Sequence, residues 1–288
     1  MALAALIGFN VLNSIAALVL LSIGLGVIFG MMKIINLAHG EFLMLGAYAT
    51  VITTNAGLNL FFAMLVVAPL FVGAVGLIVE RGIIRFLYGR MIDTMLATWG
   101  LSLFLVGIIT TIFGTTVKGV AAPFGGFAIG RYQASAYSVF MIVMAAAVLL
   151  GIWATLRFTR FGLIARATMQ NPDMAAALGV SPPRIYMATF VLGAALTGLA
   201  GGVLVPVSGV APTMGAAYIA RAFITVIGGG AAIITGSGLA SALFGFIDQV
   251  VTFQTTPVFG EVALLISALV MIRILPQGIT GRFFRRSL

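Results

Sequence analysis

The stretch IINLAHGEFLML places an amide, an imidazole and a carboxylate close together in an otherwise apolar sequence. Asn36, His39 and Glu41 can donate or accept protons and carry charge, and Gly40 permits a tight backbone turn among them. An acidic side chain inside a bilayer costs at least about 2.5–3.5 kcal/mol, so it takes a protein partner or faces a water-filled path. The cluster predicts a pathway or gating site, or else groups that cap the backbone where a membrane helix breaks.

Enzymatic and metal chemistry have little support in the residue types. The chain has no cysteine and one histidine, so a metal site would need ligands from distant segments. A hydrolase is unsupported as well, because the chain has neither a GxSxG motif nor a second histidine for a dyad. Neither Lys33 nor Lys118 lies in a GxxxxGK[ST] context, so the chain is no P-loop ATPase by itself. We expect no catalytic residue, metal or cofactor, and any ATP hydrolysis would belong to another polypeptide.

The composition requires lipid as the solvent for most of the surface. Of the 288 residues, 62% are hydrophobic and 7% are charged, whereas a soluble domain has about a quarter of its residues charged. A single core stops growing at roughly 250–300 residues, so these apolar side chains cannot all be hidden in one. The net charge of +9 comes from basic residues at the ends of apolar runs, which indicates topology rather than nucleic-acid binding. The sequence predicts an all-α, polytopic membrane protein.

A bilayer-spanning helix needs about 20 apolar residues. Apolar runs lie near 6–31, 36–54, 60–79, 94–114, 137–156, 185–207, 219–235, 239–254 and 260–275. The second, seventh, eighth and ninth runs are short, so they are candidates for half-helices or re-entrant segments. We expect about eight to ten spanning or half-spanning helices in one domain covering residues 1–288.

The distribution of arginine predicts the orientation. Arginines cluster in the gaps at 80–93 and 157–184 and at the C-terminus, whereas 208–218 holds no Lys or Arg. By the positive-inside rule, the arginine-rich segments, the C-terminus among them, face the cytoplasm in a multi-pass protein. The Gly-rich segment 115–136 is then expected as an external loop.

Two stretches of the chain are similar to each other. GLGVIFGMM leads to NLAHGEFLMLGAY, which ends at Tyr48, and GLAGGVLVP leads to VSGVAPTMGAAY, which ends at Tyr218. Five runs begin before the second copy, so pseudo-repeats over about 10–135 and 185–275 would have opposite orientations, as in many transporters. Chance similarity among Gly/Ala-rich helices is the alternative. The candidates for the translocation path or helix breaks are Asn36, His39, Glu41, Tyr48, Trp99, Tyr218 and Asp248.

The sequence GLGVIFGMMKIINLAHGEFLMLGAY closely resembles the N-terminal motif of permease subunits of ABC importers for branched-chain amino acids and related small polar solutes. GLIARATMQNPDMAAALGV is similar to the cytoplasmic coupling segment of that family, which here lies within about 157–184. ITVIGGGAAIITGSGLASALFG and ILPQGITGR resemble two further family segments, so the resemblance covers about 10–282. It assigns ATPase coupling to Gly162, Arg166, Ala167, Asn171, Ala175, Ala177, Leu178 and Gly179.

The resemblance implies a division of labour among several polypeptides. This chain would pair with a second homologous permease subunit in the lipid bilayer to form the path. Two cytoplasmic ATPase subunits would push on the segment around 165–181, which we expect to be a short helix. An external solute-binding protein would deliver the solute, and no nucleic acid is involved.

The solute is predicted from one segment. LYGRMIDTMLATWGLSLFL, residues 87–105, resembles the urea and short-chain amide subgroup more than the leucine-type permeases. A path poor in fixed charge suits a small neutral solute, whereas a branched-chain amino acid would need partners for its ammonium and carboxylate groups. The alternatives are a branched-chain amino acid permease, a passive small-solute channel and a membrane enzyme.

Overall fold

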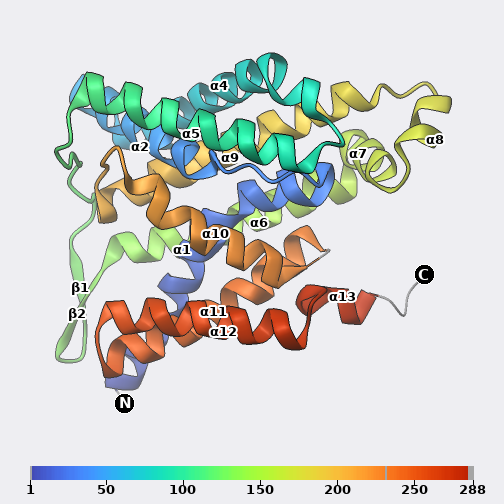
Figure 1. Ribbon diagram of the computed structural model, residues 1–288. Coiled ribbons are helices and arrows are strands. Elements are labelled where there is room, and N and C mark those ends of the chain that lie inside the picture. The colour runs from blue at the N-terminus through green and yellow to red at the C-terminus, as the bar shows by residue number, and fades with distance from the viewer. Residues whose placement is uncertain (1, 231, 285–288) are drawn as a thin grey trace. The chain divides into compact units, whose positions relative to one another are not determined.

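The computed structural model describes residues 2–230 and 232–284, and its elements are almost entirely helices (Figure 1). In chain order the elements are α1 (Ala2–Met32), α2 (His39–Asn55), α3 (Leu60–Phe62), the π-helix η1 (Ala63–Val67), α4 (Ala68–Gly82), the 3₁₀-helix η2 (Ile84–Leu87), α5 (Met91–Phe113), β1 (Gly126–Ile129), β2 (Tyr132–Ser135), α6 (Ala136–Phe158), α7 (Arg160–Gln170), α8 (Pro172–Ala177), α9 (Pro182–Ser208), α10 (Met214–Gly229), α11 (Ile233–Gln254), α12 (Pro257–Ile274) and α13 (Gly278–Phe284).

Seven helical segments among the described residues are long and apolar enough to cross a membrane, which confirms a polytopic helical membrane protein. They are Ala2–Met32, Leu60–Gly82, Met91–Phe113, Ala136–Phe158, Pro182–Ser208, Ile234–Gln254 and Pro257–Gly281. The nine predicted runs correspond to these segments and to the two shorter helices α2 and α10.

Two details of the structure differ from the predicted runs. The run predicted at 219–235 instead ends as α10 at Gly229, because Gly230 takes a left-handed backbone conformation (φ +81°) that stops the helix. The eighth and ninth runs belong to helices of spanning length rather than to half-helices. Only the second and seventh runs form helices of 17 and 16 residues, which are shorter than a bilayer requires.

The chain divides into two compact units, which we describe separately. Unit 2 comprises 23–121 and 151–220, and its centre is the packing of α2 and α4 against α9. Glycine makes this packing close: a Cβ atom at Gly46 would lie 2.6 Å from the Cα atom of Gly198. Small residues at such crossings bring helix backbones together in lipid, where apolar side chains alone give no drive to associate. Phe42 of α2 and Phe190 of α9 add an edge-to-face ring contact at 6.1 Å.

Unit 1 comprises 1–22, 122–150 and 221–288, and contains the antiparallel neighbours α11 and α12 (Figure 1). The beginning of α1 packs on α11, where a Cβ atom at Gly245 would lie 2.9 Å from the backbone nitrogen of Ile15. Strands β1 and β2 form an antiparallel hairpin, which pairs Gly126 with Ser135. The sequence predicted only an irregular loop there, since the alternation in these strands is short and mostly exposed.

The segment after α6 forms two helices instead of the single helix expected at 165–181. Asn171 separates α7 from α8: its backbone is extended, and its side chain caps α8 by accepting from Met174 N at 2.9 Å. Pro172 then occupies the first turn of α8, where its missing N–H costs no hydrogen bond. Helix α8 ends at Ala177, two residues before Gly179, whose backbone is left-handed (φ +85°).

Candidate functional site

The candidate site lies at the start of α2, and α2 begins far from where α1 ends. Lys33 and Ile34, directly after α1, line a pocket together with Tyr186, which is near the beginning of α9. His39 contacts Thr197, near the middle of α9. At a rise of 1.5 Å per helical residue, Tyr186 and Thr197 are about 16 Å apart along the axis of α9. The irregular segment 33–38 therefore runs back along α9, and α2 begins beside the middle of α9.

Asn36 and Thr98 hold the backbone of this irregular segment. The Asn36 side chain accepts from Ala38 N at 3.0 Å, and the Thr98 hydroxyl of α5 accepts from Leu37 N at 3.0 Å. The Thr98 and Asn36 side chains are fully buried. Backbone groups outside a helix need protein partners at membrane depth, because lipid offers none. Asn36 thus replaces water for the chain where the helix is interrupted.

His39 begins α2 and joins it to α9. The Thr197 hydroxyl donates to the Gly193 carbonyl at 2.8 Å, so it accepts from His39 Nδ1 at 3.3 Å. A Cβ atom at Gly24 would lie 3.0 Å from Thr197 N, which shows how closely α1 passes this point. The imidazole is fully buried, and its hydrogen bond fixes the entry of α2 on the middle of α9.

The beginnings of α2 and α10 meet at Gly40 and Gly215. A Cβ atom at Gly40 would lie 2.6 Å from the Gly215 carbonyl carbon, and one at Gly215 would lie 2.8 Å from Glu41 Oε1. Glu41 is in the first turn of α2, so its carboxylate lies beside the N-terminal ends of both helices. Each end carries a partial positive charge from its unpaired N–H groups, which stabilises an adjacent carboxylate by about 0.3–1 kcal/mol.

Glu41 has one satisfied and one unsatisfied oxygen. The Ser102 side chain of α5 donates a hydrogen bond to the carboxylate. Glu41 Oε2 is buried without a hydrogen-bond partner, as is Asn36 Nδ2. The two helix ends give the carboxylate a favourable field, while the unpaired atoms leave capacity for another polar contact.

The remaining candidates are spread over several elements. Tyr48, on α2, has a buried hydroxyl without a partner and stacks on Phe113 at 4.8 Å. Trp99 follows Thr98 on α5 but is 55% exposed, and Tyr218 is half-buried on α10. Asp248 belongs to unit 1, where its Oδ2 accepts from Ser14 at 3.0 Å. The structure thus brings together only the cluster of Asn36, His39 and Glu41.

Gly40 has a different role from the expected one. The sequence predicted a helix break at Gly40, but the break precedes His39 and Gly40 lies within the first turn of α2. The residue in the left-handed backbone region is Lys33 (φ +53°), directly after α1. Glycine is needed at 40 because the Gly215 backbone leaves no room for a Cβ atom.

Sequence reasoning missed a second polar cluster, at the end of α4. Glu80 is 1% exposed, and the Tyr88 hydroxyl donates to its Oε1. Burial, and secondly the hydrogen bond to Glu80, raise the pKa of Tyr88 above its ordinary value. Tyr88 also contacts the ring of Tyr186 at 5.1 Å and lines the pocket of about 310 Å³ beside Lys33. An acidic residue next to Arg81, at the end of an apolar run, was the available signal.

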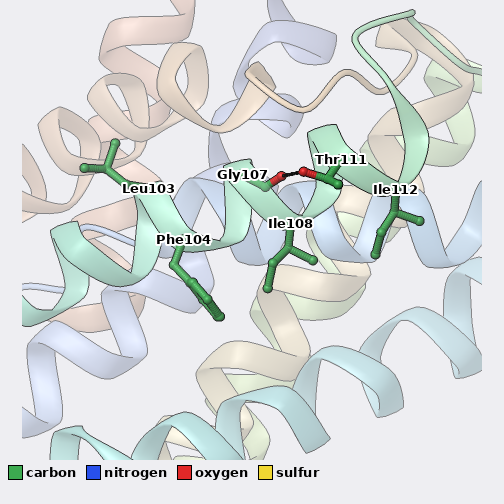
Figure 2. A pocket seen from close by; sticks show the side chains of 6 residues that line it. All are labelled: Leu103, Phe104, Gly107, Ile108, Thr111 and Ile112. Carbon is green, nitrogen blue, oxygen red and sulfur yellow. Dashed lines mark hydrogen bonds between the residues drawn. The ribbon is translucent and has the colours of Figure 1, made fainter.

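A larger hollow, of about 440 Å³, lies on one face of α5 (Figure 2). Its lining comes from a single helix: Leu103, Phe104, Gly107, Ile108, Thr111 and Ile112. The Thr111 hydroxyl donates to the Gly107 carbonyl at 2.8 Å, so it is turned toward its own helix. The lining is therefore apolar and suits lipid or another membrane helix rather than a polar solute.

Replacing Glu41 separates a cap from a charge-dependent role. We expect Glu41→Gln, which keeps an acceptor oxygen, to retain most assembly and transport, because it still accepts from Ser102. Glu41→Leu should lower the yield of folded permease, since the Ser102 donor would be left without its acceptor beside two helix ends. Size-exclusion chromatography and uptake would be measured on both. If both variants assemble normally and lose transport equally, the cap role is wrong.

Comparisons with known proteins cover almost the whole chain. The family described as "Branched-chain amino acid transport system / permease component" matches residues 7–275. The permease LivH of Escherichia coli K12 is 25% identical over 95% of this chain and 94% of its own length. A probable LivH of Methanocaldococcus jannaschii is 28% identical over 92% and 88%. BraD of Pseudomonas aeruginosa, also a high-affinity branched-chain amino acid permease, is 26% identical over 91% of each chain.

A solved structure shares the fold. PsaBC from Streptococcus pneumoniae, determined in complex with a Fab, has a TM-score of 0.51 and covers 96% of this chain and 93% of its own. At 16% identity, this likeness concerns the architecture alone.

Proposed function

Since the chain belongs to the permease-component family of branched-chain amino acid transport systems, we propose that it forms the membrane path of an ATP-driven importer for a branched-chain amino acid. The family match over residues 7–275 carries this proposal. It is a transport subunit, an ABC permease of the inner membrane that crosses the bilayer several times.

The position at which α2 begins supports a role in transport. Broken helices in secondary transporters place helix ends near the middle of the bilayer, where polar groups can meet a solute without exposing the backbone to lipid. Here α2 begins near the middle of α9, with Asn36, His39 and Glu41 around its first turn. These three residues are the proposed gate of the path.

A branched-chain amino acid is a better proposal for the solute than urea. The sequence favoured urea or a short-chain amide on residues 87–105 alone. The curated relatives that match over nearly the whole chain are named for branched-chain amino acids, and none of the three described above is named for urea. The match over the whole chain therefore outweighs the resemblance of one segment.

The proposed complex has four kinds of component. A second homologous permease completes the path, two ATPase subunits bind the α7–α8 segment, and an external solute-binding protein delivers the amino acid. The arginines after α4, after α6 and at the end of the chain support a cytoplasmic C-terminus. The exposed Leu163, Met174 and Leu178 give the α7–α8 segment an apolar surface that needs cover.

Uptake by the reconstituted complex tests the solute. We expect leucine, isoleucine or valine to stimulate ATP hydrolysis and to enter proteoliposomes that contain the complete complex. Excess urea or acetamide should compete poorly, because neither carries the two charges of an amino acid. Urea uptake that leucine does not reduce would return the chain to the urea subgroup. A complex without either uptake would contradict an importer for these solutes.

A further inference from the structure

Unit 1 holds an ion pair between two of its apolar helices, α10 and α12. Arg221 of α10 and Glu261 of α12 make two parallel contacts, Nε to Oε1 and Nη2 to Oε2, each at 3.1 Å. Such a fork is the geometry in which a guanidinium binds a carboxylate most strongly. The side chains are 30% and 42% exposed, so the pair is open on one side.

The exposed side of the ion pair is unfavourable in contact with lipid. Charged residues inside membrane helices face protein or a water-filled cavity, because hydrocarbon does not solvate them. Arg221 is in the central part of α10, and Glu261 is in the second turn of α12. The exposed part of the pair therefore faces water or a partner protein rather than acyl chains.

A second carboxylate, that of Asp248, lies beside Gly260 of α12. Asp248 Oδ1 would be 3.1 Å from a Cβ atom at Gly260, the residue directly before Glu261. Asp248 Oδ2 accepts from Ser14, which fixes the side chain on α11. Asp248 and Glu261 are the acidic residues of unit 1, and Glu261 is the one that pairs with Arg221. The second carboxylate of unit 1 therefore packs against the residue that precedes Glu261 in α12.

On the basis of the proposed function, we propose that Arg221 and Glu261 bind the carboxylate and the ammonium group of the transported amino acid. The solute's carboxylate takes the guanidinium fork, while its ammonium group contacts Glu261. One ion pair is exchanged for two, so no charge is left unpaired when the pair opens. A solute without charged groups cannot make this exchange, because opening the pair would leave both charges of the pair without a partner.

The inference also changes an expectation drawn from the sequence. A path poor in fixed charge suited a neutral solute, since Arg221 and Glu261 are forty residues apart in the chain and their pairing was not visible. The structure joins them into one site with both signs of charge. An amino acid with its two charged groups on one carbon matches that site.

Four variants test the proposal in the reconstituted complex with saturating, leucine-loaded binding protein. Arg221→Gln and Glu261→Gln should assemble, but leucine uptake should fall at least about tenfold, the loss of about 1.4 kcal/mol. The exchanged pair, Arg221→Glu with Glu261→Arg, restores a salt bridge and should restore assembly without restoring uptake. The matched control is Arg90→Gln with Asp93→Asn, which removes an exposed pair in unit 2 and should transport normally.

The outcomes separate this site from a structural salt bridge. Uptake within about twofold of wild type in both single variants would overturn the proposal, as would an exchanged pair that regains uptake. If the single variants do not assemble, uptake by the exchanged pair tests the proposal. If the exchanged pair does not assemble either, uptake is measured on the double variant Arg221→Gln with Glu261→Gln, whose amides can hydrogen-bond to each other. Failure of the wild-type complex to respond to any amino acid would instead contradict the proposed function.

Discussion

Gly40→Ala is expected to destabilise the permease by about 3 kcal/mol, the upper end for overpacking a filled site. The new methyl group would lie 2.6 Å from the Gly215 carbonyl carbon, and a backbone cannot move aside as a flexible side chain can. The beginnings of α2 and α10 would have to separate, which also withdraws Glu41 from the second helix end. The melting temperature of the detergent-solubilised permease, followed by size-exclusion chromatography, measures this loss.

The same substitution at Gly100 is the matched control. Gly100 lies inside α5, and a Cβ atom there meets no atom within 4 Å. Because alanine is the better helix former, Gly100→Ala should leave the stability unchanged or raise it by up to about 1 kcal/mol. The two variants are therefore expected to differ in sign. An unchanged or higher melting temperature for Gly40→Ala would show that α2 and α10 do not touch at this point.

Ala177→Glu should abolish coupling to ATP hydrolysis while the chain still inserts in the membrane. Ala177 is an exposed residue at the end of α8, so a glutamate there disturbs no packing within the chain. In a groove of an ATPase subunit, the same carboxylate would be buried without a partner, at a cost of about 3–5 kcal/mol. Co-purification of the ATPase subunits and leucine-stimulated ATP hydrolysis should both be lost, and Ala167→Glu should act in the same direction.

The control for this experiment makes the same change at a position far in the sequence from the α7–α8 coupling segment. Ala128 is an exposed residue of β1, and Ala128→Glu should leave co-purification of the ATPase subunits unchanged. Normal assembly and transport by both Ala177→Glu and Ala167→Glu would show that another segment carries the coupling. A loss of the permease from the membrane would point to folding instead.

The membrane helices could be predicted from sequence because lipid imposes one simple pattern. Every long apolar run became a helix, since a backbone in hydrocarbon has few other ways to satisfy its hydrogen bonds. The helix breaks were harder to place. The sequence located polar residues at 36–41, but whether the chain turned at Gly40 or before His39 depended on Thr98 and Thr197, which come from distant helices.

Candidate sites could be predicted where their residues are close together in the sequence, and not where the fold brings distant residues together. Asn36, His39 and Glu41 were found because polar residues are rare in apolar runs, and their closeness in the chain kept them close in space. Glu80 with Tyr88, and Arg221 with Glu261, depend on turns and on helix pairing that residue spacing does not reveal. Asn171 was taken as part of one helix because its alanine-rich surroundings favour helix on both sides.

Helix α2 also determines when the protein can be completed during synthesis. α2 leaves the ribosome early, but α9, the helix against which Gly46 of α2 packs, begins only at Pro182. Until α9 arrives, His39 lacks Thr197, and the irregular segment 33–38 lacks the neighbour that fixes its depth. A nascent chain that stops before α9 therefore lacks both the hydrogen-bond partner of His39 and the glycine contacts of α2. Completion of α9 converts an inserted chain into a folded one.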